Sequence, residues 1–372
     1  MKRAGTRAAV GVAALGAMSL VLAACGGSGD GDATGDATGG AESLSGSLAG
    51  AGSTAQEAAV RGWIAGFNDT YPDVAMSYDA VGSGGGREQF ISGAVQFAGS
   101  DAALSEEELG SARERCTGGD VAELPLYISP IAVIYNLPGV DVPHVQLSAE
   151  TIAKMFSGEI TSWTDPAIAA DNPGVEFPDV AVTPVHRSDD SGTTDNFTEY
   201  LADAGNGAWA YEADGEWPVS GGQSGQGTQG VVDVVTAAEG AIGYADASRA
   251  GELGTVALKV GEEYVPYSAE AAAAVVDASP AAEGATDTQL VIEIDRTTTA
   301  AGTYPLVLVS YSLACVTYDD AADAANVQAF LTYVASEEGQ ARAAEPAVAG
   351  SAPISADLAA KVQAVIDQIS AG

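Results

Sequence analysis

Three short turns rich in glycine, serine and threonine each stand directly before a predicted helix: Gly52-Ser53-Thr54, Gly82-Ser83-Gly84 and Asp190-Ser191-Gly192-Thr193. The N–H groups in the first turn of a helix have no partner within the helix, and glycine lacks the Cβ that would keep an anion away from the backbone. One such turn is usually only a turn, so the prediction of an anion site rests on their recurrence. Arg187, just before the third turn, adds a guanidinium that suits a tetrahedral oxyanion.

Each of these turns lies between a predicted strand and an amphipathic helix. Residues 44–49, 74–78 and 180–185 are extended and apolar enough for strands, and 95–101, which ends in Gly99-Ser100-Asp101, repeats the design. This alternation predicts α/β layers with mostly parallel strands. Two longer runs, 125–137 and 304–316, are apolar and rich in residues that favour strands. They suit either strands that cross between two domains or ordinary core strands.

Helix starts are predicted from capping patterns. Thr54 with Glu57, and Ser105 with Glu108, match the capping box, in which a hydroxyl and a carboxylate three residues later satisfy first-turn N–H groups. Ser148 is expected to begin a further helix.

The N-terminus has the pattern of a secretory signal. A basic start (Lys2, Arg3, Arg7) precedes the uncharged apolar stretch 8–24, which ends in small residues before Cys25. This pattern predicts a signal peptide over 1–24, acylation of Cys25 and a flexible tether over 25–43, because the Gly- and Asp-rich tether cannot bury enough apolar surface to order itself. An uncleaved membrane anchor is the alternative.

The charge of the chain excludes one class of partner. With 14 basic and 51 acidic residues the net charge is −37, and removal of Lys2, Arg3 and Arg7 with the signal takes it to −37 − 3 = −40. Nucleic-acid binding needs clustered Lys and Arg, so we expect no nucleic-acid partner. Once Cys25 is acylated, Cys116 and Cys315 remain as a pair that forms either a disulfide or two free thiols.

Motifs along most of the chain after about residue 44 resemble the phosphate-binding proteins of bacterial Pst-type ABC importers. The motifs are 50–54 (GAGST), 82–86 (GSGGG), 100–105 (SDAALS), 155–168 (MFSGEITSWTDPAI), 187–193 (RSDDSGT) and 240–244 (GAIGY). The resemblance implies an α/β, two-lobed periplasmic-binding-protein fold of type II with two crossover strands as hinge. Lobe I would comprise 44–126 plus 304–372, and lobe II 127–303.

The resemblance also implies a phosphate site shared by both lobes. Thr54 and Ser83 would donate hydroxyl and backbone hydrogen bonds, and Ala55 its N–H. Arg187 would pair with phosphate oxygens while Asp189 orients it. The implied phosphate-binding residues are Thr54, Ala55, Ser83, Asp101, Arg187, Ser191, Gly192 and Thr193.

Asp101 is the unexpected member of an anion site. An ionised carboxylate only accepts hydrogen bonds, so it can bind the P–OH of phosphate but repels sulfate, which carries no proton near neutral pH. The alternative is an acid that caps a helix or faces solvent. Two positions depart from the family: Ala55 stands where an aromatic residue is common, and Asp190 replaces a glycine and either faces solvent or weakens binding.

Other functions find less support in the residues. The only histidines are His144 and His186, no nucleophile elbow or Walker loop is present, and Cys and His lack metal-ligand spacing. The segment 225–230 matches a dinucleotide fingerprint, but no hydrophobic strand precedes it, which predicts a loop near the cleft. Binders of arsenate, sulfate or molybdate, a phosphatase and an adhesive lipoprotein remain alternatives. We therefore expect a monomer without cofactor or metal, anchored outside the cytoplasm by the lipid on Cys25, which hands phosphate to a membrane permease.

Overall fold

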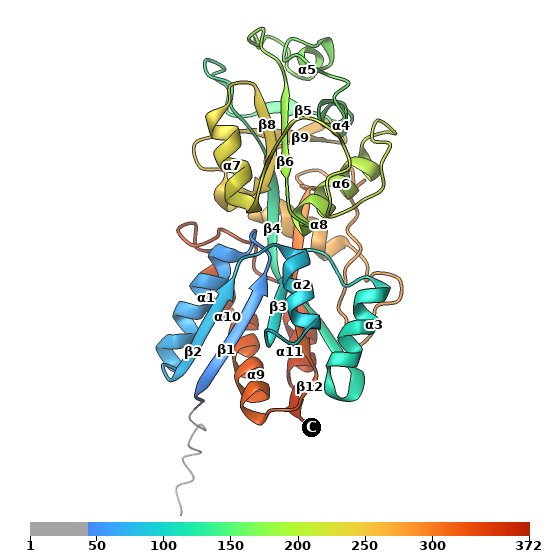
Figure 1. Cartoon of the computed structure of the whole chain (residues 1–372). Coiled ribbons are helices and arrows are strands. Elements are labelled where there is room, and N and C mark those ends of the chain that lie inside the picture. The colour runs from blue at the N-terminus through green and yellow to red at the C-terminus, as the bar shows by residue number, and fades with distance from the viewer. Residues whose placement is uncertain (1–43) are drawn as a thin grey trace, which may run out of the picture. The chain divides into compact units, whose positions relative to one another are not determined.

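Two long strands lie side by side along the middle of the computed structural model, which describes residues 44–372 (Figure 1). Strand β4 (Val121–Tyr135) and strand β11 (Val307–Cys315) pair antiparallel, and every residue of both is buried. From Ile131 onward, beyond the end of β11, β4 pairs instead with strand β8 (Ala241–Asp246). One strand is therefore shared by two groups of elements, which we call lobe I and lobe II.

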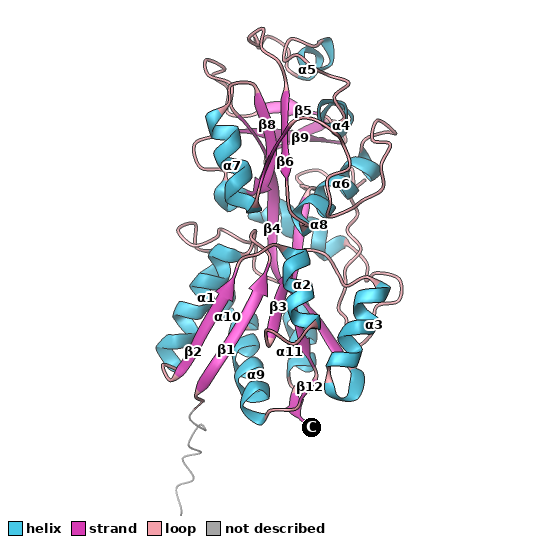
Figure 2. Cartoon of the chain, in the orientation of Figure 1, coloured by secondary structure: helices cyan, strands magenta, loops and turns pink. Residues whose placement is uncertain are grey.

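Lobe I is a sheet in the order β2-β1-β3-β11-β4, packed against helices (Figure 2). Its strands β1, β2 and β3 are parallel, and β11 is antiparallel to both of its neighbours. The other strands are β1 (Gly46–Gly52), β2 (Val74–Asp79), β3 (Phe97–Ser100) and the small pair β12 (Thr317–Tyr318) and β13 (Ser370–Ala371). The helices are α1 (Glu57–Thr70), α2 (Ser83–Ile91), α3 (Glu106–Arg115), α9 (Ala321–Ala335), α10 (Glu337–Ala344) and α11 (Ala356–Ile366).

Lobe II continues the sheet as β4-β8-β6-β7, while β9 pairs with β4 and carries β5 and β10. Strand β6 is parallel to both β8 and β7. The strands are β5 (Val145–Leu147), β6 (Thr183–Arg187), β7 (Gln223–Gly225), β9 (Gly254–Val260) and β10 (Glu263–Val265). The helices are α4 (Ala149–Phe156), α5 (Pro166–Asp171), α6 (Gly192–Ala204), α7 (Gly227–Ala237) and α8 (Ala269–Ala278).

This architecture confirms the predicted fold class, α/β with two lobes. Of the two strands expected to cross between the lobes, β4 runs through both, whereas β11 pairs only with β3 and β4. The predicted lobe boundaries, 44–126 plus 304–372 and 127–303, stay predictions, since β4 passes from one lobe to the other without a break. The predicted signal peptide, the acylated Cys25 and the tether lie outside the described residues.

Most predicted helix starts are correct. Ser105 and Glu108 form the expected capping box of α3, and Ser148 caps α4. The capping box of Thr54 and Glu57 is wrong: α1 begins at Glu57, and no side chain caps it. The Thr54 hydroxyl instead accepts the N–H of Thr228 at 3.1 Å, and Ser53 Oγ accepts the N–H groups of Ala55 and Gln56.

A covalent link ties the end of helix α3 to the end of strand β11. Cys116 and Cys315 form a disulfide with their Sγ atoms 2.02 Å apart.

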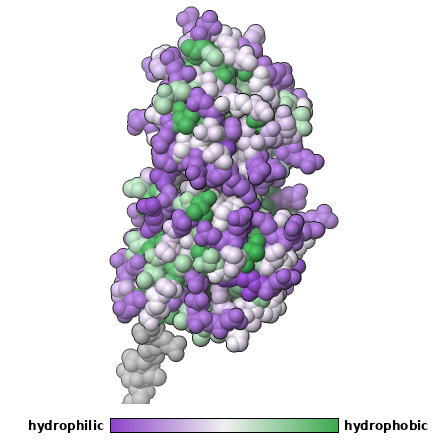
Figure 3. Space-filling view, viewed as in Figure 1, coloured by the Kyte–Doolittle hydropathy of each residue, from purple (hydrophilic) through white to green (hydrophobic). Residues whose placement is uncertain are grey.

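Hydrophilic residues cover most of the face seen in Figure 3, and hydrophobic ones show as separate patches. Within residues 44–372, no helix has the length and apolar character that crossing a membrane requires.

Candidate oxyanion-binding site

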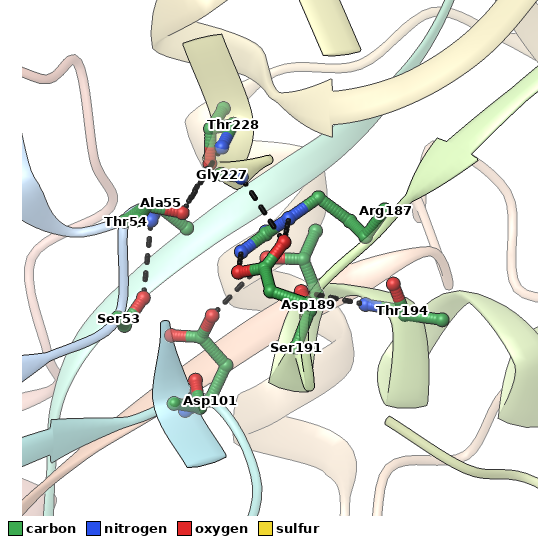
Figure 4. A network of polar contacts seen from close by, with 12 residues as sticks. Ser53, Thr54, Ala55, Asp101, Arg187, Asp189, Ser191, Thr194, Gly227 and Thr228 are labelled. Atoms are coloured by element: carbon green, nitrogen blue, oxygen red, sulfur yellow. Dashed lines mark hydrogen bonds and ion pairs between the residues drawn. The ribbon is translucent and has the colours of Figure 1, made fainter. Parts of the chain in front are cut away.

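Four helices begin where the two lobes face each other. Helices α1 and α2 follow β1 and β2, which are parallel, and α6 and α7 follow β6 and β7, which are also parallel. Because parallel strands end at the same edge of a sheet, each lobe presents its turns together. The polar side chains of the turns before α1, α6 and α7 lie together with Asp101 and Arg187 (Figure 4). All eight predicted phosphate contacts are buried there: Thr54, Ala55, Ser83, Asp101, Arg187, Ser191, Gly192 and Thr193.

The turn before α1 touches lobe II directly. Thr54 Oγ1 lies 2.9 Å from Thr228 Oγ1 and accepts the Thr228 N–H at 3.1 Å. The N–H of Ala55 donates to Ser53 Oγ, so Ala55 can offer it to a ligand only by exchanging that bond. Thr54 thus lies at the contact between lobes, and the predicted backbone role of Ala55 requires a small rearrangement.

Asp101 follows β3 and is almost completely buried between the lobes, with 3% of its surface exposed. Its N–H donates to Ser83 Oγ, and its Oδ2 accepts from Thr193 Oγ1, each at 3.1 Å. Its Oδ1 has no hydrogen-bond partner among the described residues. Burial raises the pKa of Asp101, although nearby hydroxyl groups and the charge of Arg187 oppose the shift. A buried carboxylate oxygen without a donor is costly, so Oδ1 is an acceptor that a proton donor on a ligand would satisfy.

Arg187, at the end of β6, is held by Asp189 along one edge. Its Nε donates to Asp189 Oδ1 at 2.8 Å and its Nη2 to Asp189 Oδ2 at 2.5 Å, while the Gly227 N–H also reaches Oδ1 at 3.0 Å. Burial opposes ionisation of Asp189, but Arg187 and this N–H outweigh it and lower its pKa. The fork of the guanidinium has a second edge, and fixing the first edge leaves the second for an anion.

The start of α6 forms the lobe II side of the site. Ser191 caps the helix by accepting the Thr194 N–H at 3.3 Å. A Cβ at Gly192 would lie 2.7 Å from the Cβ of Asp101 and 2.9 Å from Ser83 Oγ, so only glycine fits this contact. Gly192 and Thr193, two of the three residues predicted to cradle the anion, therefore contact Asp101, and Gly192 also lies against Ser83.

Comparison with known proteins places this chain in a family. The family described as the PBP superfamily domain matches residues 33–338. The phosphate-binding protein PstS2 of Mycobacterium bovis is 34% identical over 379 residues, covering 100% of both chains. The phosphate-binding protein PstS of Xylella fastidiosa is 32% identical over 259 residues, covering 68% of this chain and 67% of its own. This chain belongs to the PstS family of the PBP superfamily.

Solved structures agree with the PstS fold. A high-affinity periplasmic phosphate-binding protein, solved bound with phosphate, matches with a TM-score of 0.69 at 22% identity, covering 86% of this chain and 93% of its own. The phosphate-binding protein of Stenotrophomonas maltophilia matches with a TM-score of 0.65 at 19% identity, covering 86% and 93%. At these identities the likeness bears on the fold, and it supports the two-lobed class predicted from the sequence.

Two residues of the site in this PstS-family chain were missed by the sequence prediction. The segment 225–230 was expected to be a loop near the cleft. The loop is wrong, because the segment spans the end of β7 and the start of α7, but the place is correct, since Gly227 and Thr228 contact Asp189 and Thr54. Strand β7 is only three residues long and polar, so no hydrophobic alternation predicts it. The available signal was Gly227-Thr228 before Val231, Val232 and Val235 at helical spacing.

The histidine nearest the site has a packing role. His186 stacks on Trp217 with ring centroids 5.0 Å apart at 11°, and its Nδ1 lies 2.8 Å from the carbonyl oxygen of Arg187. These contacts fit a residue that packs in the wall of the site better than a general base. In the described part of the chain, no group of three or more His, Cys, Asp or Glu residues could hold a metal ion.

Proposed function

We propose that this protein is an extracytoplasmic solute-binding protein that captures inorganic phosphate between its lobes and delivers it to an ABC importer. The observation that carries the proposal is Asp101 Oδ1, a buried acceptor without a donor, beside a guanidinium and helix starts from both lobes. An anion that still carries a proton can donate to Asp101 and at the same time accept from the guanidinium and the N–H groups of the helix starts. The relatives named phosphate-binding proteins support the same ligand.

The proposed contacts divide by chemistry. Arg187 and the N–H groups and hydroxyls of the turns bind the phosphate oxygens, whereas Asp101 accepts the hydrogen of P–OH. Sulfate presents only acceptors to Asp101, and an unmatched buried pair of acceptors costs several kcal/mol, about a thousandfold or more in affinity. The proposed binding residues are Thr54, Ala55, Ser83, Asp101, Arg187, Ser191, Gly192 and Thr193, with Asp189 orienting Arg187.

The membrane attachment belongs to the same proposal. A lipid on Cys25 would hold the binding protein beside its permease as a monomer, and the lipobox-like residues before Cys25 support this. Mass spectrometry of the protein from membranes should find Cys25 as the acylated N-terminus. An unmodified Cys25, or an uncleaved segment 1–24, would contradict the anchor.

Isothermal titration calorimetry tests the ligand. The chain from residue 25, with Cys25→Ser to avoid acylation, is titrated with phosphate, sulfate, arsenate and a nucleotide monoester. We expect one phosphate per chain, no measurable sulfate binding at the same concentrations and no hydrolysis of the ester. Arsenate also keeps a proton, so Asp101 should accept it. Hydrolysis of the ester would favour a phosphatase instead, and no binding of any anion would remove the proposal.

A further inference from the structure

An ion pair joins the two lobes at the mouth of the site. Arg87 lies in helix α2 of lobe I, and Asp190 lies directly before helix α6 of lobe II. The Nη2 atom of Arg87 is 3.3 Å from Asp190 Oδ2, and the exposed fractions of the two side chains are 11% and 42%. The sequence left Asp190 either facing solvent or weakening binding, and the structure instead pairs it with a cation of the opposite lobe.

Arg87 is held in place from its own side of the cleft. Its Nε donates to Glu108 Oε1 at 2.7 Å, and its Nη1 donates to Ser100 Oγ at 3.3 Å. Glu108 is itself fixed, because its other oxygen accepts the N–H of Ser105 in the capping box of α3. A guanidinium already ordered in this way loses little side-chain freedom when it meets the carboxylate, which favours the pair.

The carboxylate of Asp190 also fits a space made by two glycines, one from each lobe. A Cβ at Gly84 in the first turn of α2 would lie 2.1 Å from Asp190 Oδ2, and a Cβ at Gly215 would lie 2.3 Å from Oδ1. Any larger residue at either glycine would displace the carboxylate. The place over the first turn of α2 is also favourable for a negative charge, since the helix dipole is positive there.

We propose that Asp190 is a positioning residue that holds the lobes closed and so slows the release of phosphate. The proposal rests on the phosphate-binding function above. The two side chains belong to opposite lobes, so moving the lobes apart would break the pair. An interaction made only in the closed state shifts the equilibrium toward that state and lowers the rate of opening.

The opposite interpretation makes an opposite prediction. If Asp190 merely repelled the anion, its neutralisation would tighten binding and slow release. If it holds the lobes together, its neutralisation speeds release and leaves association nearly unchanged. The sign of the change in the release rate therefore decides between the two.

Stopped-flow release of bound phosphate into a scavenger tests the proposal with D190N. We expect release about three- to tenfold faster than in the wild type, as one partly exposed ion pair allows. In R87Q, which lacks the partner, D190N should add little further acceleration. D214N is the matched control. Asp214 lines a small cavity that Arg87 and Asp190 also line, but it makes no ion pair among the described residues, so the release rate of D214N should match the wild type.

A salt series on the wild type provides a readout that needs no variant. Release should accelerate as potassium chloride screens the pair, and the acceleration should be smaller in D190N. Release from D190N that equals or is slower than wild type, or a wild-type rate that salt leaves unchanged, would overturn the role of Asp190. A wild type that binds no phosphate would overturn the proposed function instead, so the two failures are distinguishable.

Discussion

Replacing Asp101 with asparagine keeps the shape of the side chain and removes its charge at the place where Oδ1 lacks a partner. A charge-assisted hydrogen bond to P–OH is worth about 1.5–3 kcal/mol and a neutral one about 0.5–1.5 kcal/mol, so phosphate affinity should fall about tenfold. Sulfate affinity should rise about tenfold or more, because the asparagine amide can turn a donor toward its oxygens. A preference for phosphate of about a thousandfold or more should therefore shrink to about tenfold.

Calorimetric titration of wild type and D101N with both anions measures this change. D195N is the charge control, since Asp195 lines the cavity that Asp101 also lines and its carboxylate makes no hydrogen bond to a described residue. Burial raises the pKa of Asp101, so this carboxylate takes up a proton at a higher pH than an ordinary aspartate. As pH falls, the preference of the wild type for phosphate over sulfate should therefore begin to decline above the usual range of an aspartate, whereas the preference of D101N should not change there. A D101N variant that still excludes sulfate as strongly as the wild type would refute the reasoning about the proton.

Four further predictions concern the electrostatic repulsion of phosphate by the whole chain, the roles of Asp189 and Asp246, and the disulfide. Phosphate association should speed up as salt rises from very low levels, because screening weakens repulsion by a chain of net charge −37; a rate that falls with salt would contradict this account. In Asp189→Asn, Arg187 loses a charged partner, and calorimetry should find phosphate binding about ten- to hundredfold weaker; equal affinity would argue against the orienting role. Burial raises the pKa of Asp246 to about 6, so the folded state takes up a proton before the unfolded state does, and the free energy of unfolding should rise by up to about 3 kcal/mol as pH falls from 7 to 4. Denaturant titrations across this pH range should show that the free energy of unfolding depends less on pH in Asp246→Asn than in the wild type, and an equal pH dependence in both would refute this prediction. Reduction of Cys116–Cys315 should lower the free energy of unfolding by about 2–5 kcal/mol in the same assay, and an unchanged midpoint would show that the bond contributes nothing.

Local chemistry made part of this site predictable. The turns before α2 and α6 were predicted because glycine and serine recur before several helices and Arg187 stands beside one of them. The capping box of Thr54 and Glu57 failed because the Thr54 hydroxyl accepts the N–H of Thr228 in the opposite lobe, a partner that the local sequence does not show. Patterns of this kind identify a helix start more reliably than they identify which hydroxyl serves it.

Contacts between lobes were beyond local patterns. Thr54 and Thr228 are 174 residues apart in the chain, and Arg87 and Asp190 are 103 apart. Nothing in either segment alone indicates its partner, because the pairing depends on how the lobes close. Strand β7 adds a second cause, since a polar strand of three residues carries no periodic signal.

A crystal structure of the phosphate complex tests the central claim most directly. We predict an oxygen of phosphate about 2.5–2.7 Å from Asp101 Oδ1, at the distance of an O–H···O⁻ bond, with other oxygens against Arg187 and the start of α6. Phosphate bound elsewhere, or bound here with no oxygen in hydrogen-bond reach of Asp101, would contradict the account.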